Sequence, residues 1–257
     1  CLTMPEVGLL DDGDNDVNTD NYMVYNSLND FADLAITDNG LFAYTLGQGA
    51  SNSTLVVFAR DQRTGELTAI QTLADGDEDL SGMNGLNALA ISQDQKNVYA
   101  VSSGDDALIT FSRDTLTGLL TFEAASFDGS AGVNGVGGAV DVLVSLDDQH
   151  VYVAGKSDNA IAIFERNISN GSLSFDDLVL GVEGLSGVNT LVFDETGSYL
   201  IAVADLNQSL ASFERNNNTG ELTIVNVIQD FQINGSILEQ PVDVLVQSGT
   251  VYVSSLD

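Results

Sequence analysis

The residues in this sequence that could do chemistry are mostly carboxylates. Asp and Glu number 38 against seven Lys and Arg, which gives a formal net charge of −31. Such a surface repels the phosphates of nucleic acids and anionic lipid headgroups, so we exclude both as partners. It attracts hard cations, because crowded carboxylates relieve their mutual repulsion by binding divalent ions. The composition therefore favours Ca²⁺ as a cofactor, with an acidic solubilising coat as the alternative.

The most regular acidic spacing lies near the start of the chain. Asp12, Asp14 and Asp16 alternate with other residues, which would let their carboxylates converge on one ion. The stretch departs from an EF-hand loop, because Val17 stands where the turn glycine belongs and no Glu follows at the last ligand position. We expect either a calcium-binding loop or a disordered acidic linker.

A second set of oxygen-bearing side chains recurs where the innermost strand of each predicted repeat begins. This position reads Asp33, Asp141, Asn189 and Asp243, with Ala88 as the exception. Four such side chains around one axis could hold Ca²⁺ or ordered water. Asp and Asn also bond to backbone N–H groups at strand starts, so a structural role is the alternative.

A catalytic centre is harder to assemble from this sequence. His150 is its only histidine, and it follows the polar turn residues Asp147 and Asp148, so we expect it on the surface. No Ser-His-Asp set can be built around it. The sequence therefore predicts no catalytic residue.

The candidate ligand residues lie in a sequence that is built from repeats of one motif. The pattern Phe-x-Arg-x4-Gly-x-Leu starts at Phe58, Phe111, Phe164 and Phe213, which are 53, 53 and 49 residues apart. In the second copy, four β-branched or aromatic runs at 88–92, 98–102, 107–113 and 119–126 are separated by polar turns. This predicts an all-β fold, a β-propeller of four-stranded antiparallel blades of about 50 residues.

The repeat sets the expected domain boundaries. Residues 1–30 form an acidic N-terminal segment, either a linker or closing strands, and residues 31–257 form the propeller. The blades are expected at about 31–85, 86–138, 139–187, 188–240 and, in part, 241–257, and each complete third strand is expected to end at the repeated Phe. Either both termini close a ring of five blades, which would leave no free edge, or the chain is part of a seven-bladed propeller.

Four arginines occupy one identical position in the repeat, namely Arg60, Arg113, Arg166 and Arg215. A side chain required in every blade indicates a structural role. We expect each to be at least partly buried and bonded to a carboxylate or carbonyl of its own or an adjacent blade.

The loops between second and third strands, and those between blades, gather on one face of a propeller, and that face usually binds ligands. Here they are rich in glycine and acidic residues, among them Asp75, Asp77, Asp79, Asp105, Asp106, Asp128, Asp158, Glu183, Asp205 and Asp230. The sequence has no Trp with which to stack a sugar. This favours a flat acidic surface for cations or a protein partner over a deep organic pocket.

The sequence contains no apolar run long enough to span a membrane. Cys1, the only cysteine, resembles the lipid-anchored first residue of a mature bacterial lipoprotein; a fragment boundary or an intermolecular disulfide is the alternative. We expect a secreted or cell-surface protein, with an outer-membrane lipoprotein as one form of it.

The repeat resembles the lactonase-like seven-bladed β-propeller family. The clearest likeness is in residues 144–154 and 158–164, and the resemblance covers residues 31–257. It implies the propeller fold, whereas family members range from sugar-lactone hydrolases to surface and binding proteins. The family's enzymes use His, Glu and Arg side chains around the channel, most of which this sequence lacks.

We therefore predict a non-enzymatic, extracellular binding or structural module, stabilised by calcium and working with a protein partner or in a larger surface assembly. The first alternative is a lactone hydrolase, or a related metal-assisted hydrolase, with its site at the propeller channel. The second is a repeat scaffold of a surface filament or adhesin.

Overall fold

The computed structural model describes residues 31–48, 53–77, 79–229 and 240–256, and every helix or strand in these ranges is a β-strand. The strands form four antiparallel four-stranded sheets and one two-stranded sheet, each a simple meander in chain order. The all-β prediction and the propeller of four-stranded antiparallel blades are confirmed. No helix that could span a membrane occurs in these ranges.

Each sheet is one blade, and the blades are numbered along the chain. The first comprises β1 (Phe31–Ile36), β2 (Phe42–Gln48), β3 (Ser53–Arg60) and β4 (Leu67–Ala74). The second comprises β5 (Leu86–Ile91), β6 (Asn97–Ser102), β7 (Ala107–Arg113) and β8 (Leu120–Phe127). The third comprises β9 (Ala139–Val144), β10 (His150–Gly155), β11 (Ala160–Arg166) and β12 (Leu173–Leu180). The fourth comprises β13 (Val188–Phe193), β14 (Tyr199–Ala204), β15 (Ser209–Arg215) and β16 (Leu222–Gln229), and the fifth β17 (Pro241–Gln247) and β18 (Thr250–Ser255).

The third strands run two residues beyond the Phe at which we expected them to end. In the second blade the N–H of Arg113 still bonds to the carbonyl of Lys96, at 2.7 Å. The equivalent bond reaches Arg166 in the third blade and Arg215 in the fourth. The repeated arginine is therefore the last residue of its strand, held by the sheet.

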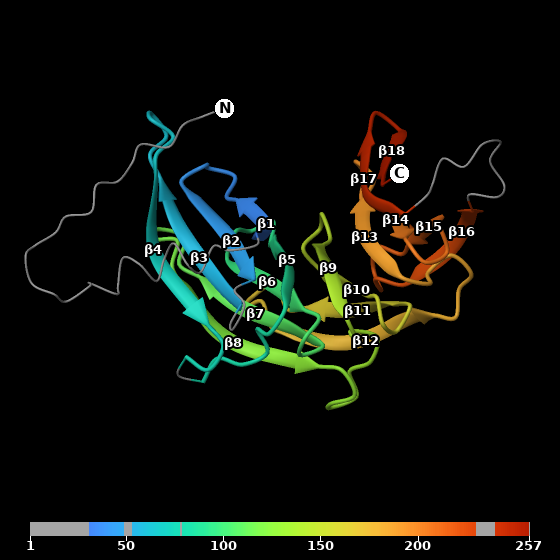
Figure 1. Ribbon diagram of the computed structural model, residues 1–257, viewed down its shortest axis with the longest axis horizontal. Helices are drawn as coiled ribbons and strands as arrows, with labels where there is room; N and C mark the ends of the chain where they lie inside the picture. Colours follow the sequence, from blue (N-terminus) through green and yellow to red (C-terminus); the bar gives the residue numbers. More distant parts are fainter. Residues whose placement is uncertain (1–30, 49–52, 78, 230–239, 257) are drawn as a thin grey trace, which may run out of the picture.

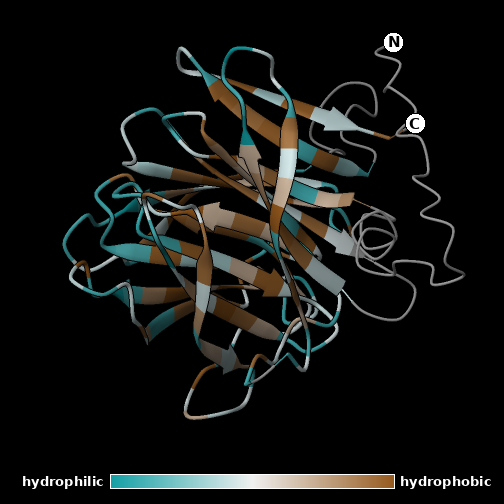
Figure 2. Ribbon diagram, turned by 90° about the vertical axis from the view of Figure 1, so that its left-hand side faces the viewer, coloured by the Kyte–Doolittle hydropathy of each residue, from teal (hydrophilic) through white to brown (hydrophobic). Residues whose placement is uncertain are grey.

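The blades stand side by side in an arc, with the first and fifth at its two ends (Figure 1). The first strands β1, β5, β9, β13 and β17 lie along the inside, and consecutive first strands are in contact. Figure 2 shows apolar residues concentrated in the strands and polar residues in the turns and loops. We call the end of the blades at which first strands begin the mouth end, and the opposite end, with the turns between strands one and two and between three and four, the turn end.

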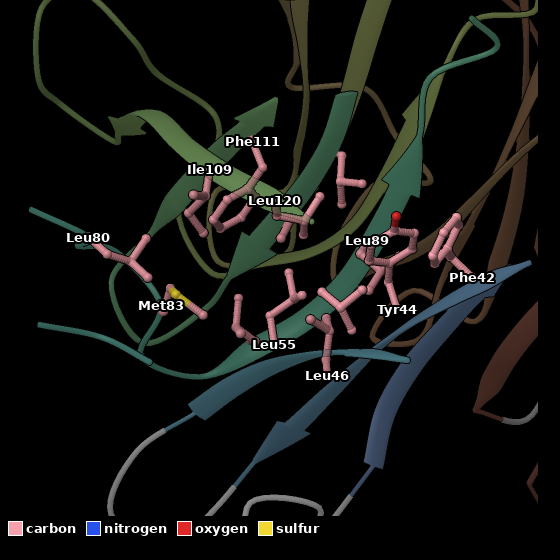
Figure 3. Close-up of a cluster of buried hydrophobic side chains, with 14 residues drawn as sticks. Phe42, Tyr44, Leu46, Leu55, Leu80, Met83, Leu89, Ile109, Phe111 and Leu120 are labelled. Carbon is pink, nitrogen blue, oxygen red and sulfur yellow. The ribbon is translucent and has the colours of Figure 1, made fainter. Parts of the chain in front are cut away.

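The core consists of apolar layers between neighbouring blades. Between the first and second blades, Leu46 and Leu55 meet Leu89, Ile109 and other buried side chains (Figure 3). Leu89 is 6% exposed because the first blade covers it, whereas Leu34, its counterpart in β1, is 54% exposed. In each later blade, the face that carries Leu89 or its equivalent is thus covered by the preceding blade. Within the described residues, no preceding blade covers the same face of the first blade.

Candidate functional site

The mouth end is shaped by a bulge near the start of every inner strand. The pairing register shifts by one residue between Phe31 and Asp33, and again at the equivalent place in the other four blades. A bulge bends the strand and redirects the side chains beside it. Polar residues next to these bulges consequently reach sideways to the next blade.

Two of the predicted carboxylates link adjacent blades. One oxygen of Asp33 accepts the N–H of its own neighbour, and the other accepts the N–H of Leu89 in the second blade, at 2.8 Å. Asp141 repeats this between the third and fourth blades, where it accepts the N–H of Leu191 at 2.7 Å. Asp243 makes the first of these bonds, to the N–H of Val244.

The even-numbered blades use amides for the same purpose. Asn87 donates from Nδ2 to the carbonyl of Ala139, and Asn189 donates from Nδ2 to the carbonyl of Val242, at 3.1 and 3.2 Å. Asn189 lies at the bulge itself, one residue before the position of Asp33 and Asp141, which Thr190 occupies in the fourth blade. The sequence-based alignment was therefore wrong by one residue in this blade, because Thr190 and not Asn189 holds the predicted position.

Asp141 is the most perturbed acid at this end. Burial raises the pKa of its carboxyl to about 7, and repulsion from Asp33 and Asp243 adds to the rise, although two backbone N–H bonds oppose it. Asp33 and Asp243 are thus near enough to Asp141 to act on its charge. A carboxyl with this pKa can exchange a proton near neutral pH.

The calcium prediction is not tested by this arrangement. Asp12, Asp14 and Asp16 lie outside the described residues. In the part of the chain that is described, no three His, Cys, Asp or Glu side chains are grouped so as to hold a metal ion. Calcium binding at Asp33, Asp141, Asn189 and Asp243 stays a prediction.

A second set of residues surrounds the bulges from the ends of the second strands. Ser103, Lys156 and Asp205 occupy one equivalent position, where each backbone N–H bonds to the first-strand start of its own blade. Lys156 Nζ lies 2.5 Å from Asp205 Oδ2 of the next blade, and these side chains are 34% and 24% exposed. The other oxygen of Asp205 is buried with no hydrogen-bond partner.

The acidic loops at this end mostly cap backbone groups. In the loop between the second and third blades, the N–H groups of Val136, Gly137 and Gly138 are directed to Asp128, Asp158 and Asp106, respectively. Burial, followed by repulsion from Asp158, raises the pKa of Asp128. The carboxylates that we expected to form a flat binding surface therefore also fix the loops between blades.

The turn end is built from a repeated contact that we call the lock. The locks are numbered by the blade that supplies the tyrosine. In the second lock, the hydroxyl of Tyr99 donates to the carbonyl of Gly171 in the third blade, at 2.8 Å, and accepts the Nε proton of Arg166 in the third blade, at 2.7 Å. Tyr44 with Arg113 and Gly118, and Tyr152 with Arg215 and Gly220, repeat it. Each lock joins one blade to the next.

Acidic turn residues complete the locks. Arg166, whose side chain is 0% exposed, also contacts Asp94 and Asp148 at 3.1 Å, and Arg215 contacts Asp147 at 3.0 Å. Burial opposes ionisation of Asp94, but bonds from Ser92, the Lys96 N–H and Arg166 outweigh it, so its pKa lies below the usual value. In the first lock Asn39 stands where Asp94 and Asp147 stand in the others, and Arg113 Nη2 has no partner.

The prediction for the repeated arginines is confirmed. Arg113, Arg166 and Arg215 are buried, and Arg60 is partly buried and donates to the carbonyl of Gly40. Tyr252 occupies the tyrosine position of the fifth blade and is 55% exposed, since no arginine reaches it from the described residues.

The prediction that His150 lies on the surface is wrong. It is 3% exposed, packs against Gly220 of the next blade and contacts Arg215 through Nδ1 at 2.9 Å. Burial, followed by the charge of Arg215, lowers its pKa. The turn before it is polar, but the neighbouring blade covers the side chain.

A separate hollow of about 590 Å³ lies at the outer rim between β4 and β8. Leu73, Asp77 and Phe122 are among its lining residues. The side chain of Gln71 crosses it to both backbone groups of Leu120, at 2.8 Å. Its lining residues include carboxylates but no basic or histidine side chain beside them. We therefore place the candidate site at the mouth end.

The sequence comparisons identify a family. Residues 33–130 and 123–236 match the model of a family described as lactonase, 7-bladed beta-propeller. A protein of Lactococcus lactis, named uncharacterized protein YwcC, is 28% identical over 139 residues, which are 54% of this chain and 38% of the relative. A second protein of that species is 29% identical over 140 residues. The chain thus spans little more than a third of the relatives it matches.

Solved structures share the fold. The periplasmic gluconolactonase PpgL of Pseudomonas aeruginosa aligns with a TM-score of 0.64 at 17% identity, over 87% of this chain and 56% of the other. A putative 6-phosphogluconolactonase of Bacteroides uniformis aligns with a TM-score of 0.59 at 15% identity, over 86% of this chain and 77% of the other. The family match contradicts the prediction of a non-enzymatic binding module and favours the alternative of a lactone hydrolase.

Proposed function

The chain belongs to the lactonase family of seven-bladed β-propellers, and from this premise we propose that it hydrolyses a lactone at the mouth end, with Asp141 as the general base. One observation carries the assignment of the residue: Asp141 lies at the start of an inner strand, beside two further acids, with a pKa of about 7. A base is most effective when its pKa lies near the working pH.

The reaction needs one proton to be moved. Water adds to the carbonyl carbon of the lactone as Asp141 takes its proton, and the ring C–O bond then breaks. The proton passes from Asp141 to the departing alkoxide, which leaves a hydroxy acid that ionises in solution. Both oxygens of Asp141 accept a backbone N–H, and each retains a lone pair for this proton.

The surrounding structure keeps Asp141 in place and basic. Its two N–H bonds come from β9 and β13, so the carboxyl is fixed between two rigid inner strands. Burial and the two neighbouring acids make the carboxylate a stronger proton acceptor than an exposed Asp. A neutral lactone bound at the mouth end would therefore meet a carboxylate that the two strands already hold in place and whose pKa is already raised.

The test is hydrolysis of glucono-1,5-lactone by the wild type and by Asp141→Asn. We expect kcat to fall about 100-fold or more, as is typical when a general base is removed. Asp33→Asn is the control for blade packing, because Asp33 makes the same pair of backbone bonds between blades. It also removes a charge that raises the pKa of Asp141, so we expect a loss of kcat that is much smaller than for Asp141→Asn. Equal losses in both variants would show that only blade packing was damaged and would refute the assignment.

A further inference from the structure

We infer that the mouth end selects uncharged lactones and rejects phosphorylated ones, with the Lys156–Asp205 pair as the element that determines this specificity. This inference rests on the proposed function, since it names the substrate class of the same site. It follows from where the positive charges of the molecule are placed and from what already neutralises them.

Only one basic side chain serves the mouth end. All seven Lys and Arg residues of the chain fall within the described ranges. Six of them lie at the turn end: Arg60, Arg63, Lys96, Arg113, Arg166 and Arg215. Lys156 alone follows a second strand at the mouth end, beside the start of β9 and two chain positions outward from the pairing partner of Asp141. Among the described residues, an anionic substrate would find no other basic side chain at this end.

That lysine is already paired. Asp205 approaches Lys156 Nζ to 2.5 Å, and the second oxygen of Asp205 is buried without a hydrogen-bond partner. A phosphate would have to displace this carboxylate from the ammonium and leave it beside the incoming dianion. The pairing therefore makes Lys156 a poor receptor for an anion.

Carboxylates surround the pair. Asp106 and Asp158 cap the loop next to Lys156, and Asp33 and Asp243 act on the charge of Asp141 in the strand beside it. Each unit charge about 7 Å from a dianion reduces its local concentration severalfold even in water. A neutral lactone meets no such barrier.

The same field favours turnover. Hydrolysis converts an uncharged lactone into a carboxylate, so repulsion that is absent for the substrate acts on the product. The acidic mouth end would then admit the substrate and expel the product without any moving part.

The local charge can be measured without reference to catalysis. In a Cys1→Ser chain, Ser103→Cys places a thiol at an exposed position equivalent to Lys156. We expect a cationic methanethiosulfonate to react with it at least about tenfold faster than an anionic one, relative to the same ratio for free cysteine, and 0.5 M salt to reduce the preference. A ratio equal to that of free cysteine would overturn the inference, whether or not the protein is a lactonase.

Substrate selection is measured with glucono-1,5-lactone and its 6-phosphate. We expect kcat/KM to be at least about tenfold higher for the uncharged lactone. A higher value for the phosphorylated lactone would overturn the inference and leave the proposed lactonase function standing. Hydrolysis of neither lactone would overturn the proposed function, while the thiol ratio would still decide the charge selection.

The Asp205→Asn variant tests the pair itself. Freeing Lys156 should raise the ratio of kcat/KM for the phosphorylated over the uncharged lactone about threefold to tenfold. Glu66→Gln removes the same charge from an exposed turn-end residue and should leave the ratio unchanged. Equal effects of the two variants would mean that total charge, and not the Lys156–Asp205 pair, governs selection.

Discussion

At the turn end of the blades, buried guanidinium groups meet tyrosine hydroxyls, backbone carbonyls and, in two locks, carboxylates. At the mouth end, carboxylates meet backbone N–H groups, and one of them, Asp141, has a pKa of about 7. Both ends join one blade to the next, but the turn end does so with its charges compensated. The mouth end retains Asp141 and an excess of negative charge, so the base that we propose lies at the opposite end of the blades from the compensated charges of the locks.

The sharpest way to break this division is to remove a lock arginine. Arg166→Ala leaves Asp94 and Asp148 without their buried partner, so the free energy of unfolding should fall by about 3 to 5 kcal/mol. Urea titration measures this, with the exposed Arg63→Ala as control, for which we expect a change below about 0.5 kcal/mol. If kcat/KM for lactone hydrolysis by the folded variant also fell sharply, the contacts at the turn end would not be independent of the proposed activity at the mouth end.

The two ends should also respond oppositely to pH. The pKa of Asp94 is lowered on folding, so its contribution to stability is present above about pH 4 and is lost as the pH falls further. The pKa of Asp141 is raised, so the folded state holds its proton more tightly and stability should decline from about pH 4 to about pH 7. The decline is at most about 1.4 kcal/mol per pH unit.

The variant Asp141→Asn isolates the second effect. We expect it to remove the decline between about pH 4 and pH 7 and to keep the loss below about pH 4. Unfolding free energies at a series of pH values measure both. A decline that persisted in Asp141→Asn would place the responsible acid elsewhere.

The lock glycines allow a smaller and more local test. Gly171 has a φ of +77° and a Cβ there would lie 2.1 Å from Asn97 Nδ2, whereas Gly65 has a φ of +80° with nothing within 4 Å. Backbone strain alone should cost Gly65→Ala about 1 kcal/mol, and the clash between blades should cost Gly171→Ala about 2 kcal/mol more. Thermal unfolding compares them. Equal losses would indicate that Gly171 is needed only for its backbone conformation.

The smallest expected effect is a gain. Asn39→Asp supplies the carboxylate that the first lock lacks, at the position from which Asp94 contacts Arg166 Nη2 in the second lock, and the equivalent Nη2 of Arg113 has no hydrogen-bond partner. Asn39 already accepts from Thr37 Oγ1 and the N–H of Leu41, as Asp94 accepts from Ser92 and Lys96, so the new side chain fits the same turn. We expect stabilisation of about 1 kcal/mol at neutral pH. Urea titration measures the free energy of unfolding of this variant, and Asp38→Asn, which changes the net charge in the same turn, is the control for net charge. An unchanged free energy of unfolding would mean that Arg113 is already satisfied by stacking on Phe42.

Much of the turn end follows from the sequence, because its residues repeat at a fixed interval. The motif located Arg113, Arg166 and Gly171 and indicated their structural role. It did not identify Tyr99 as their partner, since the contact joins different blades and a repeat describes only one. The burial of His150 was missed for the same reason: the residue that covers it belongs to the next blade.

The mouth end was less predictable. Asp33, Asp141 and Asp243 stand out by position, but their bonds to the next blade depend on bulges that no residue pattern marks. In the fourth blade the repeat alignment was one residue off and selected Asn189 in place of Thr190. Lys156 carries no motif at all. Lys156 stands apart from the other basic residues only when each of them is assigned to one end of its strand. Aligning the basic residues on the repeat would have shown this from the sequence.

The locks have a consequence for how the chain acquires its structure. Their Arg–Tyr bonds join residues 69, 67 and 63 positions apart, so each spans one repeat and none reaches a second. Contacts of such limited range suit folding by elongation, in which each finished blade is the template for the next. During synthesis, Tyr99 would stay unsatisfied until β11 leaves the ribosome and delivers Arg166. The rate at which translation supplies successive third strands would then set the pace at which the arc grows.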